Sequence, residues 1–239
     1  MPESTSAVWL AGVIALALNA YVILAGADFG GGVWDLLARG PRREEQRRLI
    51  ANAIGPIWEA NHVWLILAVV LLFTCFPPVY ARLGVVLHIP LTLMLFGIVL
   101  RGSAFVFRGH FTSHDPASHR WGRVFAIASL VTPILLGISI GAVASGRVGS
   151  AEGSFSQTYL EPWLTPFALG VGIMALVLFA FLAAVYLTLE AEEKMLREDF
   201  RRRALATGIV AFPVAMGVLF LARSGAPMIE RGLISSAWA

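Results

Sequence analysis

Charged residues and cysteine are scarce in this sequence of 239 residues. Only 14% of the side chains are charged, whereas a soluble globular domain averages about 25%, which disfavours a water-soluble fold. The single cysteine, Cys75, lies inside an apolar run and excludes an internal disulfide or a cysteine-rich zinc or iron–sulfur site. The net charge is +3, and the basic residues lie in clusters between apolar runs. Membrane spans would interrupt any phosphate-binding face, so nucleic acid is not the expected partner.

Long apolar stretches make up most of the chain. Six of them lack acidic and basic residues over about the 20 residues that a helix needs to cross a bilayer. No apolar alternation with a period of two appears, so the sequence predicts an all-α, polytopic membrane helical bundle. We expect a single membrane domain over residues 1–239. Its spans are predicted at approximately 4–34, 58–81, 79–107, 121–146, 162–190 and 203–223.

The basic residues predict how these spans are oriented. Three alternate loops hold 14 of the 18 basic residues, and positive residues concentrate on the cytoplasmic side of a bilayer. We therefore expect the N-terminus outside, with the C-terminal segment on the same side. The first span follows Glu3 rather than a basic segment and is too long for the apolar region of a cleavable signal.

Three connections also carry local predictions. Gly55 and Pro56 are expected to break the helix and to leave residues 43–55 along the membrane interface. The charged segment 190–203 is expected to continue the fifth span as a solvated helix. The Gly/Ser-rich segment 147–161 is interpreted as a simple connection.

Two carboxylates at the ends of apolar runs are the strongest candidates for chemistry. Asp28 lies 11 residues before Arg39, and Glu59 lies 11 after Arg48. Continuous helices would place each carboxylate about 16 Å from the level of these arginines, which is an upper bound for Glu59 because of the expected break at Gly55 and Pro56. Two acids at similar depth on neighbouring helices could pass protons through water. The structural alternative is that each acid pairs with a partner such as Arg101 or an indole N–H.

The histidines do not predict a haem site. His62 and His88 would differ in depth by about 16 Å on antiparallel helices, whereas the two axial nitrogens of one haem are about 4 Å apart. A single histidine ligand at a subunit boundary stays open, beside a histidine that is hydrogen-bonded to its neighbours. His110, His114 and His119 are expected to be solvated, because they form no compact metal spacing.

A glycine-rich block and an aromatic residue flank the two acids. The block around Asp28 includes Gly30 and Gly32, but it lacks the lysine and hydroxyl of a phosphate loop. Its glycines favour close helix packing around a buried acid, or alternatively local flexibility near a water path. Trp58 lies next to Glu59 and could belong to the aromatic belt, shield the acid or contact a quinone.

Several blocks together carry a resemblance to a known family. They are Gly26–Leu37, Ile54–Leu65, Phe76–Ala81, and Arg101 and Arg108 on either side of Phe105. Over residues 20–110 the sequence resembles subunit II of cytochrome bd-type quinol oxidases, and the likeness continues more loosely to about residue 222.

The resemblance implies a haem-free subunit with no catalytic residue and no metal ligand of its own. Its partner, subunit I, would carry haem b and haem d, and the complex would oxidise quinol and reduce oxygen in a prokaryotic cytoplasmic (inner) membrane. The chain would stabilise subunit I and line part of the cytoplasmic proton-uptake path. A structural quinone, lipid and additional small membrane subunits are further possible partners.

Matching residues to the family's pattern gives specific roles. Glu59 matches the acid at the mouth of the proton path and Asp28 the acid of the glycine block. Trp58 matches a residue beside a bound lipid or quinone. Structural roles are expected for Gly30, Gly32, Asn61, Trp64 and Arg101.

The sequence departs from the family's pattern in three ways. His62, which we include in the proton path, stands where the family usually has Glu or Gln. Val106 stands where an acid is common, so a second uptake carboxylate is in doubt. The family usually has more spans than the six predicted here, so the chain resembles a short form: either another chain supplies helices or the packing against subunit I differs. An independent proton-coupled transporter is the alternative that Asp28 and Glu59 also permit.

Overall fold

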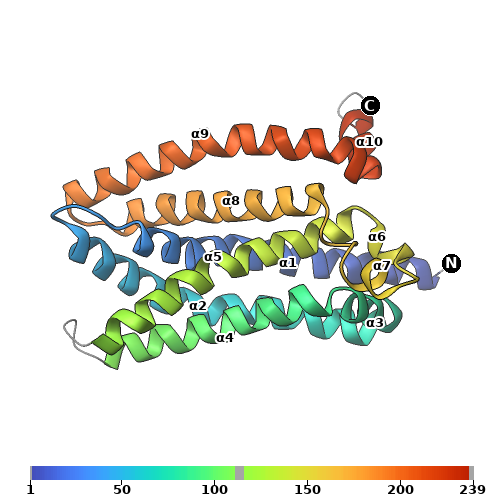
Figure 1. The fold of residues 1–239 in the computed structure, drawn as a ribbon, viewed down its shortest axis with the longest axis horizontal. Coiled ribbons are helices and arrows are strands. Elements are labelled where there is room, and N and C mark those ends of the chain that lie inside the picture. The colour runs from blue at the N-terminus through green and yellow to red at the C-terminus, as the bar shows by residue number, and fades with distance from the viewer. Residues whose placement is uncertain (1, 111–115, 237–239) are drawn as a thin grey trace.

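The structure, a computed structural model, describes residues 2–110 and 116–236, and these residues form ten α-helices (Figure 1). Six helices are long and apolar enough to cross a membrane, which confirms the predicted all-helical bundle with six candidate spans. They are α1 (Pro2–Leu36), α2 (Arg43–Cys75), α4 (His88–His110), α5 (Pro116–Ala144), α8 (Pro166–Glu190) and α9 (Lys194–Gly225). The shorter helices are α3 (Pro77–Val86), α6 (Arg147–Ser150), α7 (Phe155–Tyr159) and α10 (Pro227–Ser236).

Helix α2 runs unbroken through Pro56, so the predicted break at Gly55 and Pro56 is wrong. Proline removes one backbone hydrogen bond and normally kinks or ends a helix. Here the turn before Pro56 is held by burial, because Ile50 and Ile54 are packed into the largest apolar cluster of the bundle. Residues 43–55 therefore belong to the long helix instead of forming a separate interfacial segment.

The end of α2 differs from the predicted second span. The helix ends at Cys75 and not near residue 81, because Pro77 has no N–H with which to continue it. Pro77 instead begins the short helix α3, a position at which proline is well tolerated. Helix α4 then starts at His88, later than the predicted residue 79.

Two other connections also have more structure than expected. Helix α8 ends at Glu190, and the charged segment that follows belongs to α9, so the predicted continuation of the fifth span is wrong. Arg197 holds this turn by donating two hydrogen bonds to the carbonyl of Ala191, at 3.1 and 2.9 Å. The Gly/Ser-rich connection contains α6 and α7, and Ser154 and Gln157 form a capping box at the start of α7.

Helix α8 lies at the centre of the bundle, in contact with α1, α5 and α9 (Figure 1). Helix α1 also packs on α2 and α5, and α4 packs on α5. The connection between α1 and α2 lies at one end of the molecule, and α6, α7 and the N-terminus lie at the other (Figure 1). Four helices, α1, α2, α4 and α5, contribute the polar residues described next.

Candidate functional site

A buried ion pair joins α1 to α4. Asp28 is 0% exposed and Arg101 is 2% exposed, and Arg101 Nη2 lies 2.6 Å from Asp28 Oδ1. The same Nη2 donates a hydrogen bond to the main-chain carbonyl oxygen of Asp28, at 2.7 Å. Burying either charge alone would be very costly, so each residue lowers the free-energy cost of burying the other. The structural partner considered for Asp28 from the sequence is therefore present.

The rest of the Arg101 guanidinium is also enclosed. Its Nε donates to Ser129 Oγ of α5 at 3.1 Å. Its Cζ lies 4.8 Å from the ring centroid of Phe29 and 4.8 Å from that of Phe125, within the range of a cation–π interaction. Arg101 thus fixes α1, α4 and α5 relative to one another through one planar group, which lysine could not do.

More buried polar groups surround this pair. Asn61 of α2 is fully buried, and neither its side-chain nitrogen nor its side-chain oxygen has a hydrogen-bond partner among the described residues. The hydroxyl groups of Tyr21 and Thr132 are buried and have no hydrogen-bond partner within the described structure. Tyr21 precedes Asp28 by two helical turns on the same face of α1. Buried polar atoms of this kind are usually satisfied by ordered water.

Gly30 and Gly32 provide the close packing that the glycine block predicts. A Cβ atom on Gly30 would overlap the main-chain carbonyl of Phe179 in α8, and one on Gly32 would overlap the side chain of Ser129. Ser129 is the residue that accepts from Arg101. The absence of a side chain at Gly32 therefore keeps the partner of Arg101 in place.

His62 and Trp58 lie one helical turn apart on α2. His62 Nδ1 is 2.6 Å from the carbonyl oxygen of Trp58, and because a carbonyl oxygen only accepts, Nδ1 is the donor in this contact. The Trp58 ring packs edge-on against His62 at a centroid distance of 6.1 Å and against Phe105 of α4 at 6.4 Å. The half-buried Trp58 therefore bridges α2 and α4 beside the ion pair.

The other predicted residues are placed differently. Trp64 is 37% exposed, so it is not part of the buried cluster. Glu59 is in α2, but its side chain lies outside the described part of the structure, as do His114 and the side chains of Arg108, His110 and His119. No group of three or more potential metal-ligating side chains occurs among the described residues. That this chain binds no haem stays a prediction.

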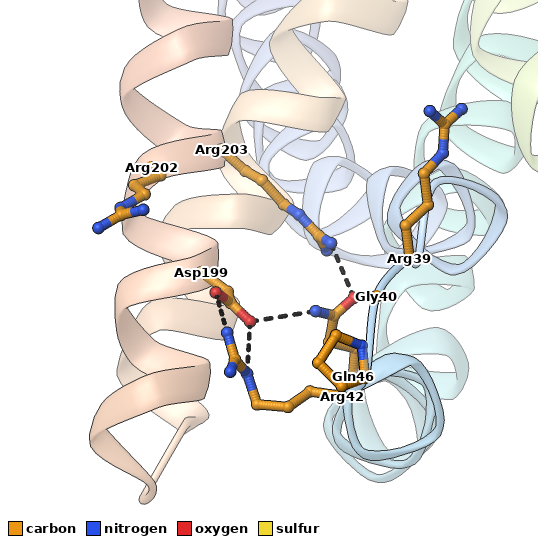
Figure 2. A pocket seen from close by; sticks show the side chains of 8 residues that line it. Arg39, Gly40, Arg42, Gln46, Asp199, Arg202 and Arg203 are labelled. Carbon is orange, nitrogen blue, oxygen red and sulfur yellow. Dashed lines mark hydrogen bonds and ion pairs between the residues drawn. The ribbon is translucent and has the colours of Figure 1, made fainter.

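Sequence reasoning missed the contributions of α5. Ser129 and Phe125 are neutral residues in the apolar run that follows Arg123, so no pattern singles them out as partners of Arg101. It also missed a second polar cluster at the α1–α2 end of the bundle, where Arg42 pairs with Asp199 of α9 (Figure 2). These residues are 157 positions apart, so only the tertiary fold brings them together.

The first cluster could support charge movement within the membrane region. It combines a carboxylate, a guanidinium, an amide and hydroxyl groups from four helices, and most of them are completely enclosed. Such groups inside a membrane usually mark ion or proton pathways or structural pairs. The fold and the site together define a multi-pass membrane protein with a buried, ion-paired acid.

Comparison with known proteins identifies the family. Residues 6–238 match the family described as cytochrome bd terminal oxidase subunit II, and the chain belongs to this family, as its motifs predict. It is 28% identical to cytochrome bd ubiquinol oxidase subunit 2 of Bacillus subtilis, over 88% of this chain and 58% of that protein. It is 27% identical to cytochrome bd-I ubiquinol oxidase subunit 2 of Escherichia coli, over 83% of this chain and 51% of that protein.

A solved structure has the same fold. The bd oxidase from Geobacillus thermodenitrificans matches with a TM-score of 0.76 and 23% identity, covering 98% of this chain and 71% of that chain.

The chain spans little more than half the length of the Bacillus subtilis and Escherichia coli subunits named above. It is a multi-pass membrane protein homologous to bacterial bd oxidase subunits.

Proposed function

We propose that this chain is the haem-free subunit II of a bd-type quinol:oxygen oxidoreductase and that it works as one membrane domain. It pairs with a subunit I that carries haem b and haem d, stabilises that subunit, and lines part of the cytoplasmic proton-uptake path. The chain alone has no turnover. Family membership supports the role in the complex, and the fully buried Asp28, paired with Arg101, supports the proton path.

In the proposed path, protons enter near Glu59 and His62 on α2 and reach Asp28 on α1. The carboxylate of Asp28 is held against Arg101 inside the bundle, and ionisable groups enclosed within a membrane commonly belong to proton relays. The buried hydroxyl groups of Tyr21 and Thr132 and the amide of Asn61 provide places for bridging water around this acid.

Trp58 is proposed to contact a lipid or a structural quinone, as its match to the family's pattern implies. Its ring is half-buried between His62 and Phe105, so one part of the indole is open to a neighbour. Small additional membrane subunits are further proposed partners of the complex.

Co-purification tests the proposed complex. The tagged chain is expressed with its neighbouring subunits, isolated in mild detergent and examined by a visible difference spectrum and by identification of the bound chains. We expect haem b and haem d bands together with a larger partner. A colourless preparation that contains only this chain would overturn the proposal and favour the independent proton-coupled transporter, which family membership otherwise disfavours.

Amide variants test the proton path in the same complex. Asp28→Asn and Glu59→Gln should lower quinol oxidase turnover per haem d about tenfold or more, since general acid–base groups typically contribute at least that much. A purely structural role would instead reduce the amount of assembled complex while turnover per haem d stays normal. Glu45→Gln is the matched control, because Glu45 is an exposed acid on the same helix. Normal turnover in both variants would overturn the path.

A further inference from the structure

An electropositive pocket lies where the α1–α2 connection faces the start of α9. Its volume is about 270 Å³, enough for a phosphate group with several waters, since one water occupies about 30 Å³. The polar lining consists of four arginines with Gln46 and Asp199 (Figure 2). None of these residues belongs to the Asp28–Arg101 cluster.

The acid in the pocket lining, Asp199, is already paired. Both oxygens of Asp199 accept hydrogen bonds from Arg42, at 2.7 and 3.0 Å, and Gln46 donates a third at 3.1 Å. This pairing raises the pKa of the Arg42 guanidinium above its ordinary value, so Arg42 stays charged. Arg202 is paired with Glu198, which lies outside the pocket lining. The positive charges of Arg39 and Arg203 have no acid of their own.

Arg203 is the central cation of the pocket. Its Nη2 donates to Gln46 Oε1 at 2.7 Å, and its Cζ lies 5.3 Å from the ring centroid of Trp34 and 4.9 Å from that of Phe200. Its Nη1 is buried and has no hydrogen-bond partner in the described part of the chain. A buried donor without an acceptor is costly, so a small outward movement of this side chain that brings Nη1 to a bound oxyanion would remove that cost.

Arg39 is an exposed cation of the pocket lining. It is exposed and makes no ion pair or hydrogen bond with the described residues. Figure 2 shows Arg203 reaching toward Gln46, while the side chains of Arg39 and Arg202 point away from that network. Arg39 can therefore turn toward a bound anion without breaking an existing contact. Guanidinium groups match the geometry of phosphate oxygens.

The surroundings favour a lipid as the source of the phosphate. On α9, Leu205, Ile209 and Phe212 follow Arg202 at intervals of three, four and three residues, and all three are exposed. This spacing places them on the face of α9 that carries Arg202, which is one of the residues that line the pocket. Acyl chains could lie along this apolar stripe while the phosphate enters the pocket. Basic pockets between membrane helices commonly bind anionic headgroups.

From these observations we propose that Arg39 and Arg203 form a phosphate-binding site for the headgroup of an anionic phospholipid. The phosphate oxygens accept hydrogen bonds from Arg203 and Arg39, and the Arg42–Asp199 pair fixes the wall of the pocket. This site is independent of the proposed proton path, and its ligand carries no electrons or protons for the reaction.

Titration of the purified protein, with whatever subunits accompany it, tests the site in neutral detergent. The probes are short-chain phosphatidylglycerol, short-chain phosphatidylcholine and inorganic phosphate, and binding is followed by native mass spectrometry and thermal shift. We expect phosphatidylglycerol to bind at least tenfold more tightly than phosphatidylcholine. If inorganic phosphate binds as tightly as phosphatidylglycerol, the lipid is the wrong source and that part of the proposal fails.

Paired variants separate the site from general surface charge. Arg39→Gln, which removes no internal contact, should weaken phosphatidylglycerol binding about three- to tenfold, and Arg39→Gln/Arg203→Gln should weaken it further. The control Arg43→Gln/Arg48→Gln removes two exposed arginines from the same end of the bundle, outside the pocket, and should change binding less than twofold. An equal loss in the control, or no loss in Arg39→Gln, would overturn the proposal.

Discussion

At the scale of single residues, the Asp28–Arg101 pair depends on the absence of a side chain at Gly32. Ser129 Oγ accepts from Arg101 Nε, and the space that a methyl group on Gly32 would need is occupied by the Ser129 side chain. The serine can yield to such a group only by moving away from Arg101. A residue without a side chain therefore influences the position of a buried arginine.

Gly32→Ala is expected to destabilise the protein by about 1–3 kcal/mol, the usual cost of overpacking a tight interior. The midpoint of thermal unfolding in detergent should fall by about 2–4 °C for each kcal/mol. Gly12→Ala is the matched control on the same helix, since a Cβ there meets nothing within 4 Å, and it should lower the midpoint by less than 1 °C, which is about half a kcal/mol or less. Equal behaviour of the two variants would show that Gly32 is not a packing constraint.

Some of the site follows from the sequence at this scale, and some does not. An acid and an arginine isolated in apolar runs must find partners, so Arg101 could be considered for Asp28 in advance. Ser129 and Asn61 are neutral residues that many membrane helices carry, and their roles depend on helix packing. The exposure of Trp64 likewise depends on which face of α2 meets its neighbours.

At the scale of helices, Arg82 of α3 connects two parts of the chain that are far apart in sequence. Its Nε donates to the carbonyl of Val148 at 2.9 Å, and its Nη2 donates to those of Gly149 and Ala151 at 3.2 and 2.6 Å. The last carbonyls of a helix have no partner within it. Helix α6 has only four residues. Its stability therefore depends strongly on the hydrogen bonds that Arg82 donates to these carbonyls.

Arg82→Gln should therefore loosen α6 and the chain that follows it. Amide hydrogen exchange in residues 147–154 should rise about tenfold, because hydrogen bonds from a charged donor typically contribute 1.5–3 kcal/mol and about 1.4 kcal/mol corresponds to a factor of ten. Exchange near Asp28 should stay unchanged. Arg223→Gln, at an exposed arginine of α9, is the control. If α6 keeps its protection without Arg82, the contact is incidental.

The helices also show where sequence patterns are reliable. Long apolar runs predicted six candidate spans, because membrane thickness sets helix length. Proline was the less reliable guide. Pro77 starts a helix, whereas Pro56 lies inside one whose preceding turn is buried. Whether proline ends a helix depends on the packing around it, which a single sequence does not display.

For the whole molecule, the sequence patterns led to the family through blocks in the first half of the chain, and the family match extends over residues 6–238. The pocket between the α1–α2 connection and α9 could not be found in this way. Its parts come from opposite halves of the chain and share no motif. Local patterns thus identify a family more readily than they locate a site built by tertiary packing.

Orientation in the membrane is the remaining prediction, and it belongs to the molecule as a whole. The positive-inside rule places the α1–α2 connection in the cytoplasm. The α6–α7 region lies at the opposite end of the bundle (Figure 1) and should therefore face outward. Glu44 and Glu152 are exposed residues in these two regions, and each can be replaced by cysteine after Cys75 has been changed to serine.

A membrane-impermeant maleimide then reports the side directly. In right-side-out membrane vesicles, Glu152→Cys should react and Glu44→Cys should not, whereas inside-out vesicles should give the reverse pattern. The Cys75→Ser parent should stay unlabelled in both. The opposite pattern would place the arginine-rich connections outside. It would also move the α1–α2 end, with the proposed lipid pocket, to the outer leaflet and remove Glu59 from the side on which protons are taken up.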